Sequence, residues 1–240
     1  MEKYRRVVLK LSGEALSDKE KKKIFQPDTL TAIAKIIGQY IAQGIQVSIV
    51  VGAGNIWRGK LASQMGLDPE DADYMGMVAT VINAMALKSV LELNGTKAKV
   101  LSALEVESVA PKFEKQLAID LLESGHVVIF AAGTGRPHFT TDTCAALRAL
   151  DIDADVILMA KEGVEGVYTA NPYEDKSAKL IKNASYHELI DLNIQALDLS
   201  ALDLLKDSAI TLRVFSMNNL ENFINILKDD KIGTVIRKGN

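Results

Sequence analysis

Short glycine-containing segments with cationic side chains follow two early apolar runs of this sequence. One is KLSG at residues 10–13, and the other is GAGNIWRG at residues 52–59, in which Arg58 stands beside the glycines. Glycine lets backbone N–H groups come close to an anion, and a guanidinium can clamp a phosphate through two hydrogen bonds. Both segments therefore predict contacts to phosphate groups. Taken alone, a lysine such as Lys10 at the end of a strand is more often simply exposed.

Two later segments also combine glycine with polar side chains. Residues 132–142, AGTGRPHFTTD, have the glycines, hydroxyls and carboxylate of a loop that wraps around a polar ligand. Asp142 could instead serve only as the N-cap of the helix that follows. In residues 160–172, AKEGVEGVYTANP, Lys161 could reach phosphates and Tyr168 could contact a base. By itself this fourth segment predicts only a loop.

Several well-known kinds of catalytic machinery are absent from the sequence. It contains no GxxxxGK[ST] motif and neither an HRD nor a DFG motif, which excludes a P-loop kinase and a protein kinase. A G-x-S-x-G elbow is also missing, and the second glycine segment lacks the spacing of a dinucleotide-binding fingerprint. The three histidines of the sequence lack the spacing of metal ligands; they are His126, His138 and His187.

Short runs rich in β-branched residues alternate along the chain with longer segments of helical spacing. The predicted strands are residues 5–10, 46–51, 97–101, 126–130, 156–159, 212–215 and 234–236. Such alternation predicts βαβ units around a mainly parallel sheet, with ligands at the carboxyl ends of its strands. A chain of 240 residues fits one α/β domain, or two lobes that share a sheet.

Two predicted helices differ in how their apolar residues are spaced. Between Leu30 and Ile41 apolar residues repeat at steps of three and four, and Gly44 follows to end the helix. Residues 72–94 leave almost no polar face, so this helix is expected to be buried nearly all round. A sheet covers only one side. The other side of the helix is expected to pack against a second protomer, which predicts a homo-oligomer, or to lie inside the core of the same chain.

Composition and charge narrow the classes of protein further. Hydrophobic residues make up 48% and charged residues 25% of the sequence, as in ordinary globular proteins. The net charge of −3 argues against a broad nucleic-acid or membrane surface. Cys144 is the only cysteine and no signal peptide is recognisable, so the expected location is the cytoplasm. The charged run 18–23 is either a solvated loop or a site for an effector phosphate.

Seven ordered segments resemble one family along the whole chain. They are KLSGEAL, GAGNIWRG, DYMGMVATVINAMAL, GTGRPHFTTD, GVYTANP, RVFSMNN and GTVI. In this order they resemble the amino acid kinase superfamily and, within it, the bacterial UMP kinases. The resemblance implies a three-layer αβα sandwich with a mainly parallel central sheet and a single domain over residues 1–240. Residues 1–150 would mainly bind UMP and dimerise, and residues 151–240 would mainly bind ATP.

The resemblance also implies a role for each residue that matches a family motif. ATP is expected at Lys10, Leu11, Ser12, Gly13, Ala53, Arg58, Tyr168 and Asn171. UMP is expected at Gly52, Asp73, Thr134, Gly135, Arg136, Pro137, His138, Phe139, Thr140 and Thr141. The expected catalytic residues are Lys10, Arg58, Asp142 and Lys161. The family further implies Mg²⁺ with ATP, transfer of the γ-phosphoryl group to UMP in pyrimidine biosynthesis, a homohexamer built as a trimer of dimers, and inhibition by UTP.

Some positions depart from the pattern of the family. Arg136 and His138 stand where Asn and an aromatic residue are usual, and Ala53 replaces a glycine. The stretch from Lys161 to Glu165 is longer than usual and has Glu165 where Asp is typical. The segment after KLSGEAL lacks the glycine-rich GFGI-like sequence, so GTP activation is not expected.

Two other functions fit part of the same pattern. One is a kinase of the same superfamily that acts on a carboxylate or carbamate, and the other is a regulator that binds UMP or UTP without turnover. The combination of Lys10, Arg58 and Asp142 argues against the regulator. The second pKa of a phosphate monoester is about 6, so a UMP acceptor oxygen is already largely anionic at neutral pH. Phosphoryl transfer to it needs no general base, which agrees with the lack of a candidate catalytic histidine.

Overall fold

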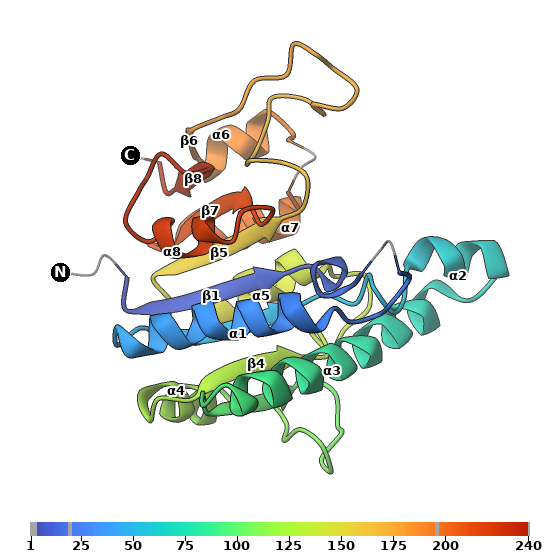
Figure 1. Cartoon of the computed structure of the whole chain (residues 1–240). Helices are drawn as coiled ribbons and strands as arrows, with labels where there is room; N and C mark the ends of the chain where they lie inside the picture. The colour runs from blue at the N-terminus through green and yellow to red at the C-terminus, as the bar shows by residue number, and fades with distance from the viewer. Residues whose placement is uncertain (1–3, 19–20, 195–196, 240) are drawn as a thin grey trace. The chain divides into compact units, whose positions relative to one another are not determined.

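The computed structural model describes residues 4–18, 21–194 and 197–239 (Figure 1). Two compact units make up the chain, one of residues 1–10 and 142–240 and the other of residues 11–141. Lys19 and Glu20, in the predicted charged loop, lie outside the described residues. Asp18 and Lys23, at the two ends of the charged run, pair their backbones through hydrogen bonds of 3.0 and 2.9 Å.

The unit of residues 11–141 contains β2 (Gln46–Val51), β3 (Ala98–Ser102) and β4 (Val127–Ala131), in the order β3-β4-β2. All of its strand pairs are parallel. The strands are almost wholly buried, as expected where helices cover both faces of a parallel sheet. Its helices are the 3₁₀ turn η1 (Gly13–Leu16), α1 (Pro27–Ala42), α2 (Gly59–Met65), α3 (Pro69–Leu93) and α4 (Lys115–Glu123).

Local sequence explains where the two long helices of this unit begin and end. Pro27 starts α1, because its ring fixes a helical φ and its missing N–H would have no partner there. Asp68 caps α3 by accepting hydrogen bonds from the first-turn amides of Glu70 and Asp71. Gly44 and Gly95, with φ of 81° and 80°, follow the two helices in the left-handed conformation that suits glycine.

The unit of residues 1–10 and 142–240 contains most of β1 (Arg6–Leu11), with β5 (Val156–Lys161), β6 (Asn183–Ser185), β7 (Thr211–Ser216) and β8 (Thr234–Arg237). Their order is β1-β5-β7-β8-β6, and all neighbours are parallel except β7 and β8. The helices are α5 (Thr141–Asp151), α6 (Tyr186–Asp191), α7 (Leu199–Leu205) and α8 (Glu221–Asn225). The first residue of α5, Thr141, is counted with the other unit.

The predicted fold class is confirmed. Each of the predicted strands is present, with ends shifted by at most two residues, and the sheet is mainly parallel. The sequence prediction missed β6, whose residues Asn-Ala-Ser include no β-branched or aromatic side chain. This short strand exists because it pairs with β8.

The long apolar helix was predicted to be buried nearly all round, by a second protomer or by the core of the same chain, and within one chain it is covered on one side only. On α3 the side chains of Tyr74, Met75, Val78 and Ile82 are 41 to 50% exposed. The alternative of a helix inside the core of the same chain is therefore wrong, while cover by a second protomer stays a prediction. By length and composition α3 is the one helix among the described residues that could span a membrane, but it packs on α1, β3 and β4 of its own unit.

Candidate active site

Lys10, Asp142 and Lys161 form one ion-paired cluster in the unit of residues 1–10 and 142–240. The two lysines come from the carboxyl ends of β1 and β5, which are parallel neighbours. Lys10 Nζ lies 2.6 Å from Asp142 Oδ1, and Lys161 Nζ lies 3.1 Å from Asp142 Oδ2. Lys10 is only 7% exposed, so it is not the solvent-exposed strand end that the sequence alone allowed.

Asp142 lies in the first turn of α5, after Thr141, so the interpretation of this residue as an N-cap is wrong. Its carboxylate accepts hydrogen bonds from the two lysines instead. Burial acts to raise the pKa of Asp142, but the charges and hydrogen bonds of Lys10 and Lys161 outweigh burial and lower the pKa below its ordinary value. Asp142 is therefore ionised at neutral pH and holds two ammonium groups in place.

Gly13 lies directly against the glycine-rich loop 52–55 in the unit of residues 11–141. A Cβ at this position would lie 2.5 Å from Asn55 Oδ1 and 2.7 Å from the Gly54 nitrogen. Within the described part of the chain, the N–H groups of Gly13, Ala53 and Gly54 have no hydrogen-bond partner. Neighbouring unpaired amides of this kind form anion-binding concavities. The backbone is thus suited to the phosphate contacts that the sequence predicts.

Gly13→Ala is expected to raise the KM for nucleotide at least about tenfold, because the new methyl group displaces the loop that carries the amides. The matched control is Gly38→Ala in α1, where a Cβ would lie 3.5 Å from Thr96 Oγ1, an ordinary contact. The control should keep its KM and gain up to about 1 kcal/mol of stability. Steady-state kinetics and thermal unfolding measure both effects, and equal KM values in the two variants would contradict the assignment.

Arg58, the predicted phosphate clamp, is bonded to its own loop and to Glu14. Arg58 Nη2 lies 2.7 Å from Glu14 Oε1, and Arg58 Nε donates to the Gly54 carbonyl at 3.0 Å. A guanidinium has five N–H donors, so these bonds orient the group and use only part of its capacity. The Arg58 side chain is 62% exposed, which leaves it accessible to a ligand.

A cavity of about 270 Å³ in the unit of residues 11–141 brings Asp73 together with the third glycine-containing segment. Of the residues predicted to bind UMP, those that line it are Asp73, Thr134, Arg136, Phe139, Thr140 and Thr141. Those that do not line it are Gly52, Gly135, Pro137 and His138. His138 nevertheless supports the site, because its backbone N–H donates to Asp73 Oδ2 at 2.7 Å. Segments about sixty residues apart in sequence thus share one cavity.

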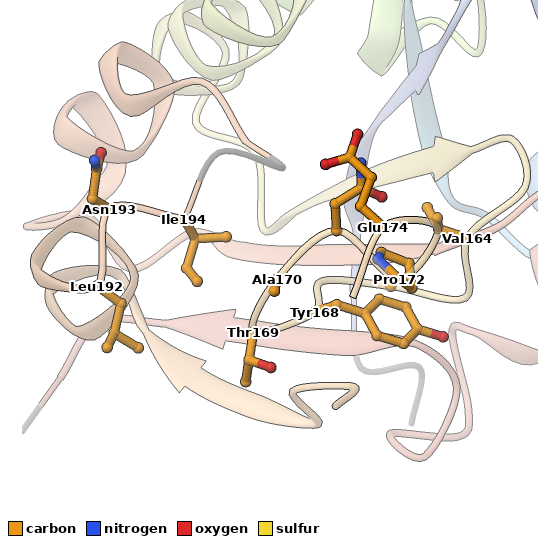
Figure 2. A pocket seen from close by; sticks show the side chains of 11 residues that line it. Val164, Tyr168, Thr169, Ala170, Pro172, Glu174, Leu192, Asn193 and Ile194 are labelled. Carbon is orange, nitrogen blue, oxygen red and sulfur yellow. The ribbon is translucent and has the colours of Figure 1, made fainter. Parts of the chain in front are cut away.

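A larger cavity, of about 640 Å³, lies in the other unit and is shown in Figure 2. Its wall includes Tyr168 and Asn171, the residues predicted on the adenine side of ATP. Figure 2 shows Leu192 and Ile194 beside the segment that carries Thr169 and Ala170. The volume lies in the range of small-molecule sites, and its apolar and polar walls would suit a planar base.

Sequence reasoning missed several residues that shape these sites. Glu14 stands in KLSGEAL but was not recognised as the partner of Arg58. Asn83 and Thr80 are polar residues within an otherwise apolar helical segment, which is a pattern that could have drawn attention to them. The segment 192–194 carries no motif, and only the folded chain places it beside Tyr168.

No cluster of three or more His, Cys, Asp or Glu side chains that could hold a metal ion occurs in the described ranges. Asp142, the buried carboxylate of the site, is already engaged by two lysines. Mg²⁺ commonly binds through substrate phosphates and water with only one or two carboxylates. The donor set therefore suits an ion carried by a nucleotide rather than one held in a protein cage.

Comparison with known proteins identifies the family. The model of the amino acid kinase family matches residues 5–216. A crystal structure of UMP kinase from Bacillus anthracis is 36% identical, covers 99% of this chain and 97% of its own, and superposes with a TM-score of 0.94. UMP kinase from Ureaplasma parvum is 34% identical over 98% of this chain and 99% of its own, with a TM-score of 0.91. Uridylate kinase from Archaeoglobus fulgidus is 32% identical over 98% of this chain and 100% of its own, with a TM-score of 0.73. The chain belongs to the amino acid kinase family.

Proposed function

We propose that this chain is a UMP kinase, which transfers the γ-phosphoryl group of ATP to UMP and releases UDP and ADP. The observation that carries the proposal is the similarity to UMP kinases along almost the whole of both chains. The cluster of Lys10, Asp142 and Lys161 agrees with it, because phosphoryl transfer depends on fixed cations.

For this reaction the protein must neutralise the charges of the two substrates and align the transferred phosphoryl group with its acceptor. Two phosphate-rich anions repel each other, and the transferred group spreads its charge over its oxygens in the transition state. Lys10 and Lys161 would stabilise that charge, with Asp142 fixing their positions. Arg58 would bind phosphate through the N–H groups that Glu14 and Gly54 leave available. The ATP phosphates would also contact Leu11, Ser12, Gly13 and Ala53.

The acceptor is proposed to occupy the smaller cavity. Asp73 would accept hydrogen bonds from the ribose hydroxyls of UMP, and Thr141 would lie near the uracil. The remaining acceptor contacts would come from Gly52 and the segment Thr134 to Thr140. A carboxylate that bonds both hydroxyls favours ribose over deoxyribose.

Asp73→Asn is expected to raise the KM for UMP about tenfold or more and to change kcat little, because hydrogen bonds to a charged acceptor are lost in both ground and transition states. Preference for UMP over dUMP should fall in parallel. The comparison variant is Glu92→Gln, which breaks an exposed ion pair with Lys88 on the same helix. A KM shift of equal size in Glu92→Gln, or unchanged discrimination in Asp73→Asn, would argue against the ribose contact.

The adenine of ATP is proposed to occupy the larger cavity, against Tyr168 and Asn171. Mg²⁺ would enter with ATP and supply further neutralisation of its phosphates. Residues 1–150 would then mainly serve UMP and dimerisation, and residues 151–240 would mainly serve ATP.

The assembly and setting are also proposals. The exposed apolar face of α3, with Tyr74, Met75, Val78 and Ile82, would be covered by a second copy in a homohexamer built from dimers. The enzyme would act in the cytoplasm in pyrimidine biosynthesis, with UTP as inhibitor, without contacts to nucleic acid or membrane. Sedimentation velocity of the whole chain tests the assembly.

The decisive experiment is an ADP-release assay with UMP, CMP and N-acetylglutamate as acceptors. Turnover with UMP well above turnover with the other two supports the proposal. Use of the carboxylate acceptor would instead identify another kinase of the superfamily. Binding of UMP or UTP without ADP release would identify a regulator.

A further inference from the structure

We infer that Asn83 and Thr80, two buried polar side chains one turn apart on α3, are positioning residues that orient the ligand loops of this unit. The inference rests on the proposed function, because the ligands of those loops are taken from it. Asn83 is 0% and Thr80 7% exposed, although both lie in a predominantly apolar helix. A buried polar group costs free energy unless it is hydrogen-bonded, so their partners show what they hold.

Asn83 holds the start of the loop between β2 and α2. Its Nδ2 donates to the Gly52 carbonyl at 2.7 Å and to Asn55 Oδ1 at 2.8 Å, while its Oδ1 accepts from Asn55 Nδ2 at 3.0 Å. Asn55 Nδ2 also donates to the Ile24 carbonyl at 3.0 Å. One buried side chain of α3 is thus bonded to both the backbone and a side chain of the glycine-rich loop.

The bond to Gly52 also decides where the next amide points. The chain has no cis peptide bond among its described residues, and in a planar trans peptide the C=O and the following N–H point in opposite directions. The Gly52 carbonyl points at Asn83, so the Ala53 N–H points away from it. That N–H belongs to the unpaired amides assigned above to phosphate. Without Asn83 the peptide could rotate and present a carbonyl oxygen, which repels an anion.

Thr80 holds the third glycine-containing segment in a comparable way. Its hydroxyl donates to the Met77 carbonyl at 2.7 Å and accepts from the Ala132 N–H at 2.7 Å. Ala132 has a φ of 61°, in the left-handed region that non-glycine residues rarely adopt. Such a conformation persists only where surrounding contacts hold it, and Thr80 supplies one of them. Gly133 follows with a φ of 56° and lines the acceptor cavity.

A third link joins the end of the first loop to the same helix. Trp57, the only tryptophan of the chain, donates from Nε1 to the Ala72 carbonyl at 2.8 Å. The loop of residues 52–57 is therefore fixed to α3 at both ends. Because Trp57 is unique, its fluorescence reports on this loop alone, whether or not the protein turns over any substrate.

Three variants and one control test the inference. Asn83→Leu keeps the volume but removes every hydrogen bond to loop 52–55, and Thr80→Val removes the hydroxyl while Thr80→Ser keeps it. The control, Leu87→Ala, removes a 2% exposed side chain one turn further along α3 that contributes no polar contact to the loops. The thermal midpoint of each variant shows how much stability has been lost.

We expect distinct kinetic effects. Asn83→Leu should lower kcat/KM about a hundredfold for both UMP and ATP, since loop 52–55 is assigned to both. Thr80→Val should raise the KM for UMP about tenfold and leave the KM for ATP within about twofold, since its loop is assigned to UMP alone. Thr80→Ser and Leu87→Ala should keep near-normal constants, even where Leu87→Ala unfolds at a lower temperature.

Measurements without substrate separate this inference from the proposed function. In Asn83→Leu, acrylamide quenching of Trp57 and hydrogen exchange of the amides of Gly52 and Ile56 should increase, because the Gly52 amide fixes the loop to the Leu11 carbonyl of β1 and the Ile56 amide donates to Ala53 within the loop. In Thr80→Val, exchange of the Ala132 amide should increase. If the wild-type protein does not use UMP, the proposed function fails while these measurements still decide the positioning role.

Purely structural roles would give a different result. Asn83→Leu and Leu87→Ala would then lose similar stability, with unchanged quenching, exchange and kinetic constants at temperatures where both are folded. If Asn83→Leu does not fold, the positioning role is tested by comparing Thr80→Val with Thr80→Ser. Equal UMP constants for that pair would overturn the inference.

Discussion

Lys10→Ala is expected to lower kcat for UMP phosphorylation at least about a hundredfold, the usual cost of removing a donor directed at developing charge. Lys10 is 7% exposed and its Nζ lies 2.6 Å from a buried carboxylate, so water cannot replace its charge with the same geometry. Asp142 would then be neutralised by Lys161 alone, which draws the second cation towards the carboxylate and away from a ligand. Substrate KM values should change less than kcat. Single-turnover phosphate transfer measures the chemical step directly.

The control for Lys10→Ala is Lys99→Ala, which removes an exposed lysine from β3. Its kinetic constants should equal those of the wild type. Lys10→Met adds a second test, because methionine fills the volume of the lysine side chain without its charge. This variant should be as inactive as Lys10→Ala. Near-normal turnover in either Lys10 variant would remove Lys10 from the catalytic group.

Much of the fold follows from local sequence patterns. The β-branched runs predicted every strand but β6, because a strand buried on both faces needs such residues along its whole length. Gly44 acts within one turn of the end of α1, so the end of this helix was predictable. The three residues of β6 form a strand only through pairing with β8, about fifty residues away.

The candidate site was predicted less completely, because its contacts join distant segments. Lys10 and Asp142 were each singled out from local sequence, but their pairing depends on β1, β5 and α5 meeting in one unit. Asn83 and Glu14 lie within segments that match the family, but they act through other residues, and neither was singled out from local sequence. The interpretation of Asp142 as an N-cap failed because α5 begins at Thr141, which places Asp142 inside the first turn of the helix, where its carboxylate pairs with two lysines.

Asp142→Asn is expected to lower kcat about a hundredfold, although the residue need not touch either substrate. The amide can accept from one lysine but carries no charge, so the ammonium groups of Lys10 and Lys161 repel each other and move apart. Extra positive charge should maintain or strengthen ATP binding, so the KM for ATP should not rise. A large fall in kcat with an unchanged or lower KM distinguishes lost alignment from lost binding.

The same variant should change the acid stability of the protein. The pKa of Asp142 is lowered in the folded state, so its ion pairs stabilise the fold above the unfolded-state pKa of about 3.9 and lose that contribution as the pH falls through the folded value. At pH 7, Asp142→Asn should be less stable than the wild type by about 3 to 5 kcal/mol, since it leaves Lys10 buried without a counter-charge. The difference should shrink on acidification below about pH 4 in urea unfolding.

Asp151→Asn supplies the matched control for both effects, because it breaks the ion pair of 2.8 Å with Arg148 on the same helix. It should leave kcat unchanged, since neither partner belongs to the lysine cluster. If both variants lost activity equally, general damage to α5 would explain the result. If Asp142→Asn kept its activity while losing stability, the carboxylate would serve the fold and not the alignment of the cations. Loss of activity confined to Asp142→Asn would mean that one buried charge sets the spacing of the two cations on which phosphoryl transfer depends.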